Sequence, residues 1–129
     1  MAQTKQALIV DGDHDIAEEL QAILDGLGFK VTTLEDTNQV AETLEANQYE
    51  VALMNMTLPD MTWRKTLRAV KSVAQDTTVI MMTRSVDEDD VRNALHAGAY
   101  IVLERPLSQE QMTHVISPRN DGMFVLLRG

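Results

Sequence analysis

The chain has 129 residues, no cysteine, and 20 acidic against 11 basic side chains, for a net charge of -9. This length suits one domain with a single core, and the lack of cysteine excludes disulfides and thiolate metal sites. The acidic balance disfavours binding to nucleic acid or to anionic lipid. No window reaches the ~18 apolar residues of a membrane span, and the start of the chain lacks an apolar leader, so we expect a cytoplasmic protein.

Short apolar runs alternate with helical patterns, which predicts βαβ units and a parallel sheet covered by helices on both faces. The run 7–10 predicts the first strand. A helix should follow it, with apolar residues on one face and with Gly26 able to end it. Asp15 and Glu18 have the spacing of a capping box, so the pattern places the helix start there.

The middle of the chain continues this alternation. Residues 30–34 predict a more exposed second strand, residues 37–46 a short second helix, and residues 50–54 a third strand that is apolar throughout. A strand of this kind is typical of one buried on both faces, so it should form the centre of the sheet. A third helix is expected over 62–74, and Trp63 at its start should either cover a neighbouring pocket or pack on the surface.

Residues 78–82 predict the fourth strand and residues 100–103 the fifth. Between them, Ser85 and Glu88 have capping-box spacing and predict the start of a fourth helix, which Gly98 should end. The whole chain therefore reads as five successive strand–helix units, an α/β fold.

A fifth helix should open at Ser108, with Gln111 completing a capping box, and Pro118 should end it. We therefore expect a domain over 1–117 and a separate C-terminal tail over 118–129. The apolar residues of this tail predict an extra strand at a sheet edge or an arm that packs on the last helix or on a second subunit. The start of a linker is an equally good interpretation.

Polar residues follow four of the predicted strands at the point where each ends. They are Asp11, Asn55, Thr83 and Arg105. Because the carboxyl ends of parallel strands meet at one edge of a sheet, and ligands bind beyond that edge, we expect these side chains to converge on one pocket.

The segments around these positions resemble the motifs of response-regulator receiver domains, and the resemblance covers residues 7–116. The matching segments read LIVDGD, NMTLPDM, VIMMTRS and AGAYIVLERPLS. The resemblance implies a flavodoxin-like three-layer sandwich with strand order 2-1-3-4-5. It also implies a role in bacterial two-component, or phosphorelay, signal transduction.

Three pocket positions depart from the family pattern. The resemblance implies a phosphoacceptor aspartate four residues before Pro59, and Asn55 stands there. A carboxamide is neutral and cannot act as the nucleophile that forms an acyl phosphate. The second acid of the family's acidic pair, which the resemblance implies binds Mg²⁺, is Gly12, and the family's lysine is Arg105.

These departures also bear on metal binding. Mg²⁺ requires several hard oxygens in near-octahedral geometry. Asp11, even with Asp13 nearby, supplies too few oxygen ligands for this geometry. We therefore expect no cofactor, with Asp11 only a weak candidate ligand for Mg²⁺. An ion pair from Arg105 to Asp11 could fill the pocket instead, because guanidinium is permanently charged and pairs well with carboxylates.

The resemblance also assigns a conformational switch. Thr83 corresponds to the family's switch threonine, whereas Val102 occupies the position of its switch aromatic residue. The usual coupling should therefore be absent or moved to Tyr100, which lies two residues earlier on the same predicted strand face.

Together these features favour a pseudo-receiver, a phosphorylation-independent regulatory and protein-interaction domain that is not an enzyme. The resemblance implies that a kinase, output domain or regulator binds the surface of the fourth helix, fifth strand and last helix, and a homodimer is a further option. One alternative is a receiver still phosphorylated on Asp11 or Asp13. Others are an engineered Asp-to-Asn change at position 55, which Gly12 and Arg105 argue against, and a small-molecule sensor.

Overall fold

A computed structural model describes residues 5–35, 38–56, 63–84, 87–105 and 107–116. Five parallel strands form one sheet of order β2-β1-β3-β4-β5. This fold and strand order confirm the prediction. The strands are β1 (Lys5–Val10), β2 (Phe29–Leu34), β3 (Val51–Asn55), β4 (Thr78–Thr83) and β5 (Ile101–Glu104).

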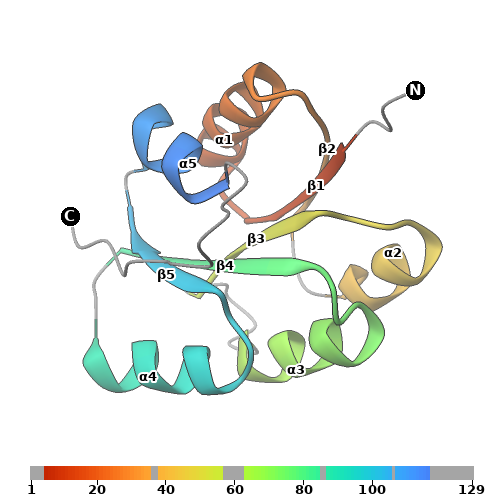
Figure 1. The fold of residues 1–129 in the computed structure, drawn as a ribbon, viewed down its shortest axis with the longest axis vertical. Helices are drawn as coiled ribbons and strands as arrows, with labels where there is room; N and C mark the ends of the chain where they lie inside the picture. The colour runs from red at the N-terminus through yellow and green to blue at the C-terminus, as the bar shows by residue number, and fades with distance from the viewer. Residues whose placement is uncertain (1–4, 36–37, 57–62, 85–86, 106, 117–129) are drawn as a thin grey trace.

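Helices cover both faces of the sheet, as predicted. They are α1 (His14–Gly26), α2 (Val40–Ala46), α3 (Trp63–Val73), α4 (Glu88–His96) and α5 (Gln109–Ile116). Figure 1 shows α1 and α5 on one face and α2, α3 and α4 on the other. None of these described helices has the length and apolar character needed to cross a bilayer.

Two hydrophobic clusters, one on each face of the sheet, form the core. In β3, Leu53 packs into the cluster beneath α1 and α5, whereas Met54 packs into the cluster beneath α2, α3 and α4. Every residue of β3 is buried. The prediction that this strand is the sheet centre is therefore confirmed, because an apolar strand of this kind needs cover on both faces.

Aspartates cap α1 and α4, and the predicted start of α1 is wrong. Asp13 caps α1 by accepting hydrogen bonds from the backbone N–H groups of Asp15 and Ile16, which replaces the predicted box of Asp15 and Glu18. Asp87 caps α4 in the same way, and Ser85 of the predicted capping box lies outside the described residues. Both aspartates have extended backbones, which turn their carboxylates toward the free N–H groups of the first turn.

The predicted capping box of α5 is confirmed. The N–H of Gln111 donates to Ser108 Oγ at 3.0 Å, and the N–H of Ser108 donates to Gln111 Oε1 at 3.0 Å. The predicted start of the second helix at residue 37 and the tail over 118–129 lie outside the described residues.

Trp63 is a core residue, so both predicted placements of it are wrong. Its side chain is 5% exposed and packs in the cluster beneath α2, α3 and α4. The guanidinium of Arg64 lies 4.8 Å from the centre of the indole ring. Trp63 shares its helix face with Leu67 and Val70, and the apolar spacing of this helix therefore turns the indole inward.

Candidate functional site

The carboxyl ends of the strands bring the predicted polar residues to one edge of the sheet. Asp11 follows β1, Asn55 ends β3 and Thr83 ends β4, and these residues are 3%, 6% and 7% exposed. Arg105 follows β5, where its N–H donates to the carbonyl of Thr83 at 2.8 Å. The parallel register aligns these strand ends, so residues far apart in the chain surround one polar pocket.

Asp11 is the centre of this pocket. Its Oδ2 accepts from Arg105 Nη1 at 2.7 Å, and its Oδ1 accepts from Asn55 Nδ2 at 3.2 Å and from the N–H of Asp13 at 2.9 Å. The predicted ion pair between Arg105 and Asp11 is therefore present. Both oxygens of the carboxylate are already engaged by donors from this chain.

The ion pair is enclosed by the protein. The side chain of Arg105 is 5% exposed and that of Asp11 is 1% exposed. Hydrogen bonds between charged groups at this separation are strong. Both groups are removed from water, so either one would be a buried, uncompensated charge without the other. Since Asn55 is neutral, the charges of Asp11 and Arg105 cancel and the pocket has no net charge among these residues.

These residues do not fit a magnesium site. A metal ion at Asp11 would have to bind a carboxylate that already accepts hydrogen bonds from Arg105 and Asn55, beside the positive charge of the guanidinium. Gly12 supplies no side-chain oxygen, and the described residues contain no cluster of three or more His, Cys, Asp or Glu side chains able to hold a metal. Mg²⁺ prefers several oxygen ligands, so the donor set is wrong for it.

The backbone does not require glycine at position 12. Gly12 is exposed, and a Cβ built on it would lie 3.4 Å from the carbonyl oxygen of Glu35, its nearest neighbour. A side chain therefore fits here with small adjustment. The fold would also accommodate an acidic residue at position 12.

Asp13 does not complete a cation site either. Its Oδ1 accepts the N–H groups of Asp15 and Ile16 at 3.0 and 3.3 Å, so this carboxylate serves as the cap of α1. The neighbouring His14 forms an exposed pair with Glu35 at 3.0 Å.

The prediction that Tyr100 lies on the same strand face as Val102 is wrong. Val102 is fully buried in the cluster beneath α2, α3 and α4, whereas Tyr100 packs against the opposite cluster. Tyr100 precedes β5, and its N–H donates to the carbonyl of Val79 near the start of β4. It therefore lies at the other end of the strand from Thr83, about 13 Å away along the sheet.

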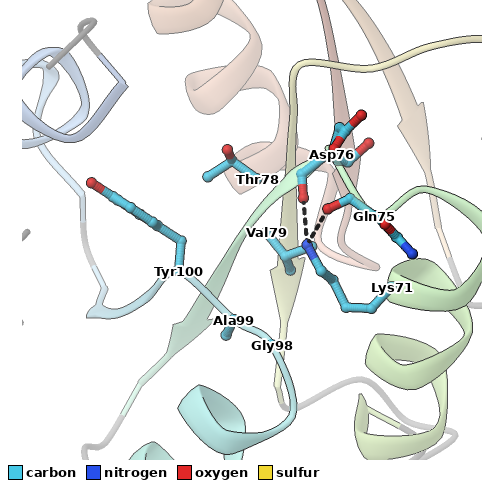
Figure 2. A pocket seen from close by; sticks show the side chains of 9 residues that line it. Lys71, Gln75, Asp76, Thr78, Val79, Gly98, Ala99 and Tyr100 are labelled. Atoms are coloured by element: carbon cyan, nitrogen blue, oxygen red, sulfur yellow. Dashed lines mark hydrogen bonds between the residues drawn. The ribbon is translucent and has the colours of Figure 1, made fainter. Parts of the chain in front are cut away.

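Tyr100 instead lines a second pocket, at the amino ends of β4 and β5. This pocket has a volume of about 270 Å³, and Figure 2 shows Lys71 and Tyr100 among the residues around it. Lys71 Nζ donates to the carbonyls of Gln75 and Thr77 at 2.9 and 3.0 Å. The ammonium thus satisfies carbonyls after the end of α3, a role that sequence reasoning missed.

Comparison with known proteins identifies the family. The model of the response regulator receiver domain matches residues 7–117. The chain belongs to the response regulator receiver family. Receivers are signalling modules of two-component systems, and this one has the flavodoxin-like architecture of the family.

Two relatives illustrate the context in which receivers occur. The autoinducer 2 sensor kinase/phosphatase LuxQ of Vibrio cholerae is 30% identical over 111 residues, which are 85% of this chain and 13% of LuxQ. The C4-dicarboxylate transport transcriptional regulatory protein DctD of Pseudomonas aeruginosa is 30% identical over 112 residues, or 86% of this chain and 24% of DctD. The receiver thus spans a minor part of the length of these relatives.

Solved receiver structures are closely similar. The beryllofluoride-activated NtrC4 receiver domain dimer has a TM-score of 0.81 at 26% identity, covering 86% of this chain and 92% of that one. The chemotaxis protein CheY4 of Vibrio cholerae has a TM-score of 0.80 at 21% identity, covering 87% and 95%. The second likeness concerns the fold alone.

Proposed function

We propose that this receiver is a pseudo-receiver, a regulatory protein-interaction module that works without phosphorylation. The observation that carries the proposal is the pairing of Asp11 with Arg105 and Asn55. At the end of β3 the chain offers an amide that donates a hydrogen bond, where acyl phosphate formation needs an anionic nucleophile. The receiver then needs no metal ion and catalyses no reaction.

The contacts of the remaining acids argue against a displaced phosphoacceptor. Asp11 Oδ2 lies 2.7 Å from a guanidinium nitrogen and Oδ1 accepts two further hydrogen bonds. Asp13 Oδ1 accepts two N–H groups of the first turn of α1. These hydrogen bonds stabilise the charge on the carboxylates and thereby lower their reactivity as nucleophiles.

We propose that the receiver acts through the surface formed by α4, β5 and α5, where it would contact a kinase, an output domain or another regulator. The names of the relatives support this context, since LuxQ is a sensor kinase/phosphatase and DctD is a transcriptional regulatory protein. The dimeric state of the NtrC4 receiver supports homodimer formation as one form of this contact. The net charge of -9 argues against nucleic acid as a direct partner.

Incubation with acetyl phosphate and Mg²⁺ tests the proposal, with intact mass and Trp63 fluorescence as readouts. Trp63 is a suitable probe because it is buried at the start of α3, beneath the guanidinium of Arg64. We expect no mass gain and no change in fluorescence. A stoichiometric gain of one phosphoryl group on the unaltered chain would overturn the proposal, and fragment masses would then locate the modified acid.

A further inference from the structure

The outer surface of α3 has a charge opposite to that of the rest of the chain. This helix contains Arg64, Lys65, Arg68 and Lys71 and no acid. These are four of the 11 basic side chains, which leaves seven against 20 acidic side chains elsewhere. A cationic surface on an acidic protein is a candidate for specific contact, because it is the part to which an anionic partner is attracted.

Two of the four cations are engaged within the fold. Lys71 donates to two carbonyls, as described above. Arg64 lies 3.4 Å from Asp90 of α4 and covers the ring of Trp63. Lys65 and Arg68 are exposed, and neither forms a hydrogen bond or an ion pair with another residue of the described ranges.

Two apolar residues, Ala69 and Val73, continue the line of Lys65 along α3. Lys65, Ala69 and Val73 are spaced at i, i+4 and i+8, so they follow one line along the helix. Val73 is 39% exposed and is the one large hydrophobic side chain that is exposed among the described residues. A single exposed valine is ordinary on a protein surface. Val73 lies on the same exposed helix as Lys65 and Arg68, about two turns beyond Lys65, so this helix presents both charge and apolar area.

We infer that the α3 outer face, defined by Lys65, Arg68, Ala69, Ser72 and Val73, docks a short acidic segment of a protein partner. Carboxylates of the segment would pair with the ammonium and guanidinium groups, and one apolar side chain would contact Val73. The contact differs from the α4, β5 and α5 surface, and it does not depend on whether the pocket accepts phosphate.

The neighbours of α3 favour a short segment over a nucleic acid. In Figure 1, α2 and α4 flank α3 on the same face of the sheet. Glu42 and Glu45 of α2 and Asp89 of α4 are exposed acids. A long polyanion lying across α3 would also meet these carboxylates, whereas a short segment along the helix avoids them. A second copy of this chain at the α3 outer face would bring its own acidic surface against the same acids of α2 and α4, so it fits this face less well than a short segment.

A synthetic peptide of glutamates with two central leucines provides the probe. Its affinity for the full chain would be measured by fluorescence anisotropy at low salt, and amide chemical shifts would locate the contact. We expect shifts centred on α3 and binding that weakens as salt screens the charges. The variant Lys65→Glu with Arg68→Glu should bind about tenfold more weakly. Val73→Ser should also lose affinity, which charge attraction alone would not explain.

Lys30→Glu is the matched control, because Lys30 is an exposed cation that lies on β2 and not on α3. It should change the affinity by less than about twofold. Absence of peptide binding, shifts centred outside α3, or equal binding by the charge-reversed variant would overturn the inference. So would a single-stranded oligothymidylate that binds as well as the peptide, because the surface would then select phosphate chains. Phosphorylation of the pocket would leave all these readouts unaffected and bears only on the pseudo-receiver proposal.

Discussion

Arg105 and Asp11 are 94 residues apart in the chain, yet Nη1 of the arginine lies 2.7 Å from Oδ2 of the aspartate. The pair is almost fully enclosed, and Asn55 donates to the other oxygen of the same carboxylate. At the edge of the sheet where the sequence predicts a ligand pocket, the carboxylate of Asp11 is therefore held by side chains of the protein itself.

Substitution of Arg105 by alanine should destabilise the receiver strongly. The carboxylate of Asp11 is 1% exposed and would remain buried without its cation, which typically costs about 3 kcal/mol in the free energy of unfolding. Urea denaturation of the two proteins measures the difference. Arg92→Ala is the control, because Arg92 forms an exposed ion pair with Asp89 and should cost at most about 1 kcal/mol. Similar losses for both variants would show that the buried pair does not stabilise the fold.

Restoring the three altered positions should restore phosphorylation. The variant with Asn55→Asp, Gly12→Asp and Arg105→Lys regains the nucleophile and a second acid, and Gly12 has room for a side chain. We expect this triple variant to gain one phosphoryl group from acetyl phosphate in the presence of Mg²⁺, measured by intact mass.

The single variant Asn55→Asp separates two explanations. It retains Arg105 against Asp11, so we expect little or no phosphorylation under the same conditions. Phosphorylation of the single variant as fast as that of the triple variant would mean that position 55 is the sole defect. That result would favour the alternative of one isolated Asp-to-Asn change.

Gly98→Ala should destabilise the receiver, although the change adds a single methyl group. Gly98 has φ of 115°, and an added Cβ would lie 2.8 Å from Lys71 Cγ. Left-handed backbone alone costs an L-residue roughly 1–2 kcal/mol. The matched control is Gly26→Ala, since Gly26 lies at the end of α1 and its added Cβ would have nothing within 4 Å. Thermal unfolding should separate the two variants, and equal melting temperatures would contradict this account.

Removal of the cap of α4 should also be measurable. Asp87 accepts hydrogen bonds from the N–H groups of Asp89 and Asp90 at 2.9 and 3.1 Å. Loss of such a cap in Asp87→Ala should cost about 1 kcal/mol of unfolding free energy. Ser85→Ala tests the competing sequence pattern in the same assay. A larger loss for the serine variant than for the aspartate variant would favour the capping box over the aspartate cap.

The errors of sequence reasoning concern choices that local patterns leave open. Asp13 and Asp15 are both suitable caps for α1, and the backbone conformation of Asp13 decides between them. The position of Trp63 in the chain is compatible with an indole that faces the pocket or the solvent. Because Trp63 shares a helix face with Leu67, its side chain instead packs in the core. Tyr100 is two residues before Val102, a spacing that places both side chains on one face of a regular strand. Tyr100 precedes β5, however, and its side chain packs on the opposite face of the sheet.

The sequence by itself determined the chemistry of the pocket. It shows that an amide stands where a nucleophile is expected, that Gly12 has no oxygen ligand, and that the cation is a guanidinium. The apolar runs also determined the parallel sheet and hence the edge at which these groups meet. Only the tertiary structure decided that Arg105 reaches Asp11, because this contact depends on the placement of β1 and β5 around the intervening strands. Composition and spacing specify which groups are available, whereas packing across the sheet specifies which of them touch.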